Sequence, residues 1–444
     1  MELRNKRVLV VGLARTGIAC ARFLVNQGAE VSVSDLRAET NLQQDVEALK
    51  GLPISYFLGG EERHWLENVD LVVPSPGVPT ENLLLREASR RGVEILSEIE
   101  LAYGFLPSPM VAITGTNGKS TTTTLVGGML EASGIKVFVG GNIGAPLISF
   151  AGGDWDWGVV EISSFQLEWI KNFRPRVAVS LNLSEDHLDR YADFDAYCRV
   201  KERLFENQTT EDIALLNRDD PRVWDQRHGK RARIVSFGWS EIDAGLFAKP
   251  GEIVWRDGFN EERFSLAKVK IQGVHNVENM MAAIGAAKAA GVESPVIQRT
   301  LEEFPGLEHR LEFVREKAGV RYYNDSKGTN VGAVAKSLAS FSAPVILIAG
   351  GVDKGGDYGV LQEGIRKRVR RLVLFGAAKE LMAKALGTMT KTVIVDDLEA
   401  AVRDAHEQAR SGDVVLLSPA CSSFDMFQNY AERGRVFKKL VQAL

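Results

Sequence analysis

Cysteine is scarce in this sequence, and long apolar runs are missing. The three cysteines among 444 residues, Cys20, Cys198 and Cys421, are too few and too scattered for a disulfide framework or a thiolate zinc site. Such sparse use is typical of a reducing compartment, so we expect a cytoplasmic protein. No run approaches the roughly eighteen apolar residues of a membrane-spanning helix, and the stretch Val8–Val11 is too short for a signal peptide. We therefore expect no membrane insertion.

A strong charge of either sign is also missing. The formal net charge is only −4, so the chain offers no basic field for nucleic acid, and we expect no nucleic-acid partner. With 45% hydrophobic and 25% charged residues, the composition is that of a soluble globular enzyme. A chain of 444 residues is too long for one ordinary core, which predicts about three domains.

The segment Thr114–Thr121 is the most informative part of the chain. It follows the apolar run 110–113, and the pattern predicts a strand, a glycine-rich turn and the start of a helix. Such a turn directs backbone N–H groups at a phosphate, Lys119 adds a cation, and the Ser120 hydroxyl can hold Mg²⁺. The common pattern places a glycine where this chain has Ile113, so the loop is a variant. The alternative is a solvated turn that carries a lysine by chance. We predict ATP or GTP binding by Gly115, Thr116, Asn117, Gly118, Lys119, Ser120 and Thr121.

A second glycine turn lies near the amino terminus. The segment Arg7–Gly17 is typical of a strand, a turn and a helix, and it resembles a dinucleotide-binding fingerprint in which Ala14 replaces the second glycine. The next predicted strand ends at Asp35, where such folds place an acid near a ribose hydroxyl. A third strand leads into Ser75 and Gly77. The fingerprint alone leaves open whether the glycines serve a diphosphate or only the turn.

Breaks in the pattern divide the chain into three α/β blocks. The segments Leu106–Pro109 and Pro305–Gly306 cannot continue a helix. In the second block, Glu241–Leu266 predicts a small excursion of short strands, and Asn276–Gly291 predicts an alanine-rich helix. The third block repeats the strand and helix pattern. We predict an α/β protein of three domains, with bounds 1–97, 98–306 and 307–444.

Two polar residues follow buried strands of the second block. Glu161 ends a strand near the phosphate loop, which favours a Mg²⁺ ligand; the alternative of a surface glutamate is disfavoured by the Val159–Val160 run before it. His187 follows the next polar strand end. It could hold a second metal ion or form a structural hydrogen bond, and the residues alone leave both open.

Lys201 lies on the apolar face of a predicted helix, Phe194–Glu206. One possibility is a lysine whose stem packs on this face while its ammonium reaches water. The other is a desolvated amine of low pKa that reacts with CO₂, giving a carbamate anion that could bind Mg²⁺. The spacing does not choose between them. The other residues of the face are Phe194, Tyr197, Cys198, Leu204 and Phe205.

Polar residues gather at three strand ends of the third block. These are the segments 322–330, 350–354 and 417–425, which are rich in hydroxyl, carboxylate and lysine groups. A plain loop explains any one of them better than it explains all three. Together they predict a polar substrate pocket.

Five motifs in combination resemble the ATP-dependent Mur ligases of peptidoglycan synthesis. The resemblance spans nearly the whole chain and is far more specific than any single motif. Within the family, the motifs are most similar to those of the members that add D-glutamate. The five segments are Gly115–Thr121, Gly141–Gly144, Glu161–Leu167, Asp186–Asp189 and Asn324–Lys327.

The resemblance implies a fold, a reaction and its partners. It implies a Rossmann-like domain that binds a UDP substrate, a central P-loop ATPase domain, and a Rossmann-like carboxyl-terminal domain that binds an amino acid. ATP would phosphorylate the L-alanine carboxylate of UDP-N-acetylmuramoyl-L-alanine, and the amine of D-glutamate would attack the acyl phosphate. We expect a monomer.

The resemblance also implies roles for individual residues. Lys119 would stabilise the transferred phosphoryl group, Ser120 and Glu161 would hold one Mg²⁺, and His187 with an N6-carboxylated Lys201 would hold a second. ATP would also contact Asn276, Asn279, Arg310, Asp325 and Lys327. The UDP substrate would contact Arg15, Thr16, Asp35, Arg37, Ser75, Gly77, Asn142, Ser163 and Gln166. D-Glutamate would contact Thr329, Lys354, Ser423 and Tyr430.

The chain departs from the family pattern at two of these places, and rival functions remain. Leu36 stands where some members place a hydroxyl residue, and Tyr430 stands where a phenylalanine can occur. An NAD-dependent oxidoreductase would use Gly12–Gly17 and Asp35 but would leave Lys119 without a role. A nucleotide-gated binding protein would leave Glu161 as a structural polar group. A sister Mur ligase or a folate-type ligase would add a different amino acid.

Overall fold

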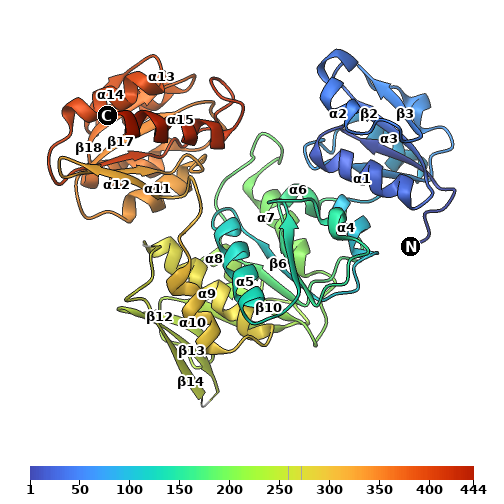
Figure 1. The fold of residues 1–444 in the computed structure, drawn as a ribbon, viewed down its shortest axis with the longest axis horizontal. Helices are drawn as coiled ribbons and strands as arrows, with labels where there is room; N and C mark the ends of the chain where they lie inside the picture. The colour runs from blue at the N-terminus through green and yellow to red at the C-terminus, as the bar shows by residue number, and fades with distance from the viewer. Residues whose placement is uncertain (259, 272) are drawn as a thin grey trace.

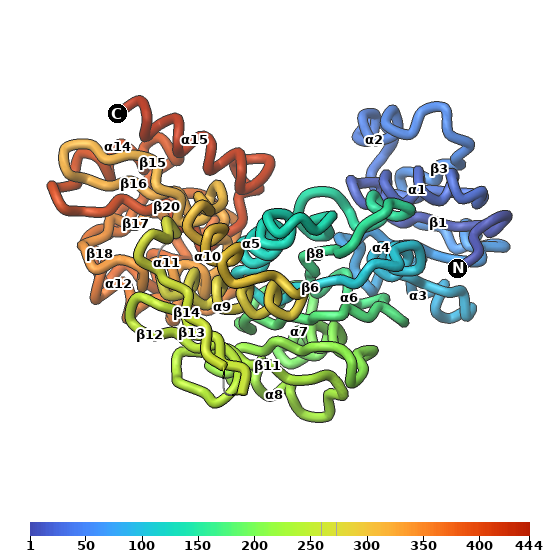
Figure 2. Tube along the Cα trace, turned by 60° about the horizontal axis from the view of Figure 1, so that its bottom comes forward, coloured from blue at the N-terminus to red at the C-terminus, as the bar shows by residue number. Residues whose placement is uncertain are grey.

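Three domains follow one another in space as they do in sequence (Figure 1). The computed structural model describes residues 1–258, 260–271 and 273–444. Each domain is built on one sheet, with helices packed on its faces. The central domain lies between the other two in both views, and the chain ends lie in opposite outer domains (Figures 1 and 2). The α/β architecture of three domains that the sequence predicts is confirmed.

The first domain has a five-stranded parallel sheet in the order β3-β2-β1-β4-β5. Its middle strand carries four consecutive buried residues, 8–11, because helices cover both faces of a parallel sheet. The strands are β1 (Arg7–Val11), β2 (Glu30–Asp35), β3 (Ile54–Leu58), β4 (Leu71–Pro74) and β5 (Glu94–Ile95). The helices are α1 (Arg15–Asn26), α2 (Gln43–Glu47) and α3 (Leu83–Arg91), and α4 (Glu98–Tyr103) leads into the central domain.

The central domain has a nine-stranded sheet in the order β14-β13-β12-β11-β10-β9-β6-β8-β7. The last three strands in sequence pair antiparallel, which confirms the excursion predicted for Glu241–Leu266. The strands are β6 (Met110–Thr114), β7 (Val137–Gly141), β8 (Trp157–Glu161), β9 (Val177–Ser180), β10 (Ile213–Asn217), β11 (Arg233–Gly238), β12 (Gly245–Lys249), β13 (Glu252–Asp257) and β14 (Asn260–Ser265).

The helices of the central domain include two that pack against each other, α5 and α9. The predicted alanine-rich helix is confirmed as α9. The helix predicted for Phe194–Glu206 is too long, because the α-helix ends at Glu202 and a 3₁₀ turn follows. The helices are α5 (Lys119–Ala132), α6 (Ser164–Leu167), α7 (Phe194–Glu202), α8 (Pro221–Asp225), α9 (Val274–Ala289) and α10 (Ser294–Glu303).

The third domain has a six-stranded sheet in the order β15-β16-β20-β17-β18-β19. All neighbouring strands are parallel except the first pair, so the polar ends of β16, β17 and β20 meet at one edge. The strands are β15 (Glu312–Lys317), β16 (Val320–Asn324), β17 (Val345–Gly350), β18 (Val369–Phe375), β19 (Lys391–Ile394) and β20 (Val414–Leu417). The helices are α11 (Val331–Ala339), α12 (Gln362–Arg368), α13 (Lys379–Leu386), α14 (Leu398–Gln408) and α15 (Tyr430–Ala443).

The apolar cores of the domains differ in how they connect. One cluster of buried side chains runs without a break from Leu3 in the first domain to Ala232 in the central domain. The third domain holds separate clusters on the two faces of its own sheet. Within the parts of the chain that the structure describes, we find no helix with the length and apolar character needed to cross a membrane.

Candidate active site

The phosphate loop joins β6 to α5 at the middle of the central sheet. Gly118 has φ 89°, and a Cβ there would lie 2.1 Å from Asn279 Oδ1, so only glycine fits. The loop is also fixed from the segment after β9, because Asn117 N–H donates to Asn182 Oδ1 at 2.9 Å and Asn182 Nδ2 donates to Asn117 O at 3.0 Å. The turn is therefore held in shape by neighbouring side chains.

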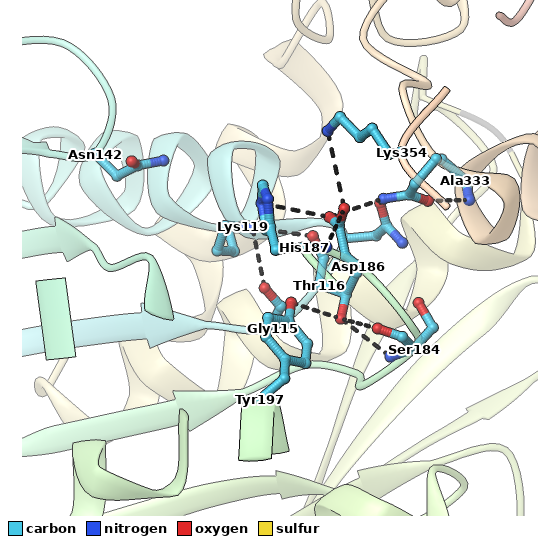
Figure 3. Close-up of polar contacts among 12 residues, drawn as sticks. Gly115, Thr116, Lys119, Asn142, Ser184, Asp186, His187, Tyr197, Ala333 and Lys354 are labelled. Atoms are coloured by element: carbon cyan, nitrogen blue, oxygen red, sulfur yellow. Dashed lines mark hydrogen bonds and ion pairs between the residues drawn. The ribbon is translucent and has the colours of Figure 1, made fainter. Parts of the chain in front are cut away.

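Lys119 folds back over this loop (Figure 3). Its Nζ donates to Gly115 O and to Thr116 O, both at 2.9 Å. Burial of the ammonium lowers the pKa of Lys119, and the positive charge of Arg310 lowers it further, while Glu161 opposes the shift. The cation is therefore held at the mouth of the loop by neutral carbonyl groups, where an anion would bind well.

Lys201 is buried beneath the same loop and is only 2% exposed. Its Nζ donates to Gly115 O at 3.0 Å and lies 4.9 Å from the centroid of the Tyr197 ring. Burial holds the pKa of Lys201 well below its usual range, and the charge of Lys119 lowers it further. The alternative of an ammonium that reaches water is wrong. An amine of low pKa is the form that reacts with CO₂, and the carbamate stays a prediction.

Glu161 ends β8 and is 3% exposed, so the alternative of a surface glutamate is wrong. Asn142 Nδ2 donates to Glu161 Oε1 at 2.7 Å. The second oxygen, Oε2, is buried without a hydrogen-bond partner among the described residues. Nearby in the loop, Ser120 Oγ accepts from Arg310 Nη2 at 3.0 Å. A buried carboxylate oxygen that has no partner, together with a hydroxyl, fits a Mg²⁺ ion.

His187 lies in the loop after β9 with a left-handed backbone, φ 57°. Its Nε2 is 3.8 Å from Asp186 Oδ2, and its ring packs 4.7 Å from the ring of Phe165. Burial lowers the pKa of His187, although Asp186 opposes the shift. The imidazole is therefore neutral near pH 7, which is the form that ligates metal ions. Figure 3 shows His187 beside Asp186.

A pocket between the central and third domains gathers most of the residues predicted to bind ATP. The sequence interpretation missed His275 and Lys336, which also line it. Burial lowers the pKa of His275 to about 4, so this ring is neutral. The predicted residues in the lining are Asn117, Gly118, Thr121, Asn276, Asn279, Arg310, Asp325 and Lys327.

Arg310 reaches the phosphate loop from a strained linker. The residues on either side of it, His309 and Leu311, have φ 65° and 44°, a region that side chains rarely adopt. The linker is fixed to the third domain, because Lys327 N–H donates to His309 O at 3.0 Å and Leu311 N–H donates to Asp325 Oδ1 at 3.3 Å. This strain is the cost of directing Arg310 from one domain into the other.

Two residues that the third domain contributes to this pocket, Asp325 and Lys327, have shifted pKa values. Burial raises the pKa of Asp325 to about 6, although Ser337 and Ser418 each donate to Oδ2 at 2.7 Å. Burial, together with the charge of Arg310, lowers the pKa of Lys327 to about 8. Both pKa values are shifted in the direction that disfavours the charged form, as expected for buried residues that await a charged ligand.

The four residues predicted for the amino acid are not gathered in one cavity. Lys354 lines a small cavity and its Nζ lies 3.8 Å from Asp186 Oδ1. Thr329, Ser423 and Tyr430 do not line this cavity. Tyr430 instead lies under Lys327, whose Nζ is 3.8 Å from the ring centroid.

Arg433, which the sequence interpretation missed, connects two loops at this edge of the third sheet. Its side chain is fully buried, and Nη2 donates to Ser326 O at 2.9 Å and to Cys421 O at 3.2 Å. Nη1 donates to Ser422 O at 3.2 Å. The loops after β16 and β20 are therefore held by one guanidinium. Spacing along α15 gave no signal for this long-range contact.

The predicted sugar-nucleotide residues of the first domain lie around the carboxyl end of β1. Asp35 accepts from Leu13 N–H at 2.8 Å and forms an ion pair with Arg37. A pocket here is lined by Asp35 and Gly77 among others, and Ser75 Oγ donates to Gly12 O at 2.7 Å. The remaining predicted residues of this domain, Arg15 and Thr16, begin α1, and Leu36 is 64% exposed.

Two further residues of this group begin α6. Ser163 N–H and Oγ both donate to Gln166 Oε1 at 3.0 Å, which forms a capping box. Gln166 also hydrogen-bonds to Glu98, a buried residue that the sequence interpretation missed. Burial raises the pKa of Glu98 to about 7, and its Oε1 accepts from Ile148 N–H at 2.7 Å.

Comparison with known families assigns all three parts of the chain. The Mur ligase MurD-like N-terminal domain matches residues 6–97, the Mur ligase middle domain matches 113–287, and the Mur ligase glutamate ligase domain matches 309–421. The chain belongs to the Mur ligase family. Mur ligases are ATP-dependent and use Mg²⁺, so the hypotheses of an NAD-dependent oxidoreductase and of a binding protein without ligase chemistry are wrong.

Full-length relatives and a solved structure agree with this assignment. The chain is 54% identical to UDP-N-acetylmuramoylalanine--D-glutamate ligase of Geotalea uraniireducens, over 100% of this chain and 99% of the relative. It is 51% identical to the protein of the same name from Geotalea daltonii, with the same coverage. A pseudomurein peptide ligase type C from Methanothermus fervidus shares the fold, with a TM-score of 0.62 at 20% identity over 99% of this chain and 100% of that one.

Proposed function

We propose that this Mur ligase joins D-glutamate to UDP-N-acetylmuramoyl-L-alanine with the energy of ATP, in cytoplasmic synthesis of peptidoglycan precursors. The observation that carries the proposal is the 54% identity to a D-glutamate ligase over the full length of both chains. The site supports it chemically. A carboxylate is a poor electrophile, so it must be activated before an amine can attack it, and the phosphate loop supplies the means.

In the first half of the reaction, the L-alanine carboxylate attacks the γ-phosphorus of ATP. Lys119, held by the carbonyls of Gly115 and Thr116, stabilises the charge on the transferred phosphoryl group. Arg310 adds a second cation from the third-domain side, since it already contacts Ser120 in the loop. The bond from the γ-phosphorus to the bridging oxygen breaks, ADP leaves, and an acyl phosphate forms.

The residues present fit two Mg²⁺ sites. Ser120 and Glu161 would hold one ion, and His187 and an N6-carboxylated Lys201 would hold the other. Bound Mg²⁺ supplies charge neutralisation for the phosphates and orients them. The fit is supported by the partnerless Oε2 of Glu161, by the neutral imidazole of His187 and by the buried amine of Lys201.

In the second half, the amine of D-glutamate attacks the acyl phosphate carbon, and inorganic phosphate leaves. Lys354 is placed to attract a carboxylate of this amino acid, because its ammonium lies beside the central domain at Asp186. Thr329, Ser423 and Tyr430 lie on the same domain and would complete the site after closure. Closure of the third domain would also exclude the water that hydrolyses acyl phosphates.

The division of labour among domains is part of the proposal. Residues 1–97 would bind the UDP substrate, 98–306 would bind ATP, and 307–444 would bind the amino acid. One chain provides all three parts, which supports a monomer as the active species. The sugar nucleotide and ATP are both cytoplasmic metabolites, which supports that location.

Phosphate release tests the proposal directly. The purified protein with Mg²⁺, ATP and UDP-N-acetylmuramoyl-L-alanine is supplied in turn with D-glutamate, L-glutamate, L-alanine, glycine and L-lysine. We expect phosphate release and a new UDP-linked product only with D-glutamate. Release with another amino acid alone would replace the substrate assignment by that of a sister Mur ligase. A response only to a folate acceptor would indicate a folate-type ligase.

A further inference from the structure

Arg190 is a buried cation outside all the ligand contacts proposed above. Its side chain is 9% exposed and pairs with Glu168, which is 6% exposed. Nε donates to Glu168 Oε1 at 2.9 Å, and Nη2 donates to the other carboxylate oxygen. A buried ion pair gains little net stability unless its geometry is good, and truncating one partner leaves the other charge uncompensated. The buried pair with Glu168 therefore indicates that the Arg190 side chain has to be held in one position.

The same guanidinium reaches into the first domain. Nη1 donates to Pro76 O at 3.1 Å and Nη2 donates to Val78 O at 2.9 Å. These two carbonyls flank Gly77, and the turn is closed by Val78 N–H, which donates to Ser75 O at 2.9 Å. A residue of the central domain therefore sets the direction of the carbonyls in the turn that carries Ser75 and Gly77.

On its other side, Arg190 supports His187. The guanidinium carbon lies 4.2 Å from the centroid of the Phe165 ring, and that ring packs on the His187 imidazole. Arg190 N–H also donates to His187 O at 3.0 Å, which fixes the backbone where His187 has its left-handed φ. Arg190 is thus in contact with both the sugar-nucleotide turn and the support of a proposed metal ligand.

The geometry points to Arg190 as a positioning residue that couples the sugar-nucleotide turn of the first domain to His187 at the phosphoryl-transfer site. It acts through Pro76 and Val78 on one side and through Phe165 on the other. The inference rests on the proposed function, because it requires a sugar nucleotide in the first domain and ATP in the central one. Coupling between two sites is reciprocal, so each ligand tightens the binding of the other.

The test measures this coupling by calorimetry. The dissociation constant of a nonhydrolysable ATP analogue with Mg²⁺ is determined with and without saturating UDP-N-acetylmuramoyl-L-alanine. In the unchanged protein, we expect the sugar nucleotide to tighten analogue binding by roughly fivefold or more, the low end of typical coupling between sites. In Arg190→Met, which keeps the packing on Phe165, we expect this ratio to fall to about one. Arg190→Lys, which keeps the charge without the bidentate contact, is the second variant.

Arg203 provides the matched control. Its guanidinium donates to Leu167 O, Glu168 O and Ile170 O, so it binds carbonyls of the same segment. All of its contacts among the described residues lie within the central domain. We expect Arg203→Met to lower the unfolding temperature and to leave the coupling ratio unchanged.

Steady-state kinetics complete the test. For Arg190→Met, we expect KM for the sugar nucleotide to rise by about tenfold and KM for ATP, measured at low sugar nucleotide, to change little. Coupling that persists in both Arg190 variants, or that is lost equally in Arg203→Met, would overturn the inference. An unchanged protein that releases no phosphate with D-glutamate would instead count against the proposed function, and the binding ratio would still decide the role of Arg190.

Discussion

Two glycine turns in this chain share one local design and differ in what occupies them. The first joins β1 to α1, and the second joins β6 to α5. Both need glycine for the same reason, because a Cβ at Gly17 would lie 2.1 Å from Gly12 O and one at Gly118 would lie 2.1 Å from Asn279 Oδ1. The glycines alone therefore describe the shape of a turn and not its ligand.

The neighbouring side chains make the difference. In the first turn, Asp35 already accepts from Leu13 N–H, and Arg37 Nη2 donates to Leu13 O at 2.8 Å. In the second turn, Lys119 donates to carbonyls of its own loop, and among the described residues no carboxylate forms an ion pair with it. In the first turn a carboxylate already occupies the Leu13 amide, whereas the cation of the second turn is free of such a contact among the described residues and suits phosphate.

Removal of the cation at each turn gives the largest expected contrast. We expect Lys119→Ala to lose about a hundredfold or more in kcat, as for other preorganised groups that stabilise transition-state charge. Arg15, the exposed cation at the start of α1, is the counterpart, and we expect Arg15→Ala to raise KM for the sugar nucleotide with kcat nearly unchanged. Steady-state phosphate release measures both. A near-normal kcat in Lys119→Ala would contradict the assignment of phosphoryl transfer to the second turn.

The contrast becomes sharper at Lys201, whose amine lies against the second turn at Gly115 O. We expect Lys201→Ala to lose about a hundredfold in kcat and to recover part of it with added short carboxylic acids, because these replace the anion of a carbamate near the phosphates. Lys119→Ala with the same additives is the control, and we expect no recovery there. Full activity of Lys201→Ala without any additive would contradict carbamate ligation.

A methyl group added to either turn should weaken the binding of that turn's own ligand. We expect Gly118→Ala to weaken binding of an ATP analogue by about tenfold or more, because the left-handed φ and the contact with Asn279 both oppose a Cβ. We expect Gly17→Ala to lower the unfolding temperature and weaken sugar-nucleotide binding, while analogue binding persists. Calorimetric titration measures the affinities. Equal loss of ATP-analogue affinity in both variants would show that the turns do not act separately.

The smallest effect concerns pH and the first turn. Burial alone would raise the pKa of Asp35, but hydrogen bonds from Arg37 and Leu13 outweigh it and lower the pKa. A lowered carboxylate pKa stabilises the fold above the unfolded pKa of about 4, and this stabilisation is lost as pH falls through the folded value. We expect Asp35→Asn to unfold at a lower temperature than the unchanged protein at pH 7, and we expect this difference to shrink as the pH falls below about 4. A constant difference across this range would assign the effect to packing.

Much of this fold was predictable, because the buried strands of a parallel sheet appear in the sequence as short apolar runs between turns. The runs at Val8–Val11 and Met110–Ile113 predicted β1 and β6, and the excursion at 241–266 was predicted from its polar alternation. The end of α7 was not, since Arg203 and Leu204 suit a helix as well as the 3₁₀ turn they form. Local preference is nearly the same for both, and tertiary packing decides.

The site divides in the same way. Lys119 was predictable because its contacts lie within four residues in sequence. The burial of Lys201 was predictable as one of two outcomes, because helical spacing gives a face and not the depth to which the face is buried. The contacts of Arg190 with Glu168 and Pro76 span 22 and 114 residues, and that of Arg433 with Ser326 spans 107. No local pattern encodes such contacts.

The continuous core of the first two domains has a consequence for synthesis of the protein. Domains tend to fold as they leave the ribosome, amino-terminal first. The apolar cluster from Leu3 to Ala232 can therefore assemble while the third domain is still being translated. At that stage the phosphate loop exists, but Arg310, Asp325 and Lys327 do not yet line the nucleotide pocket. An unfinished chain thus has only the part of the nucleotide pocket that the central domain provides.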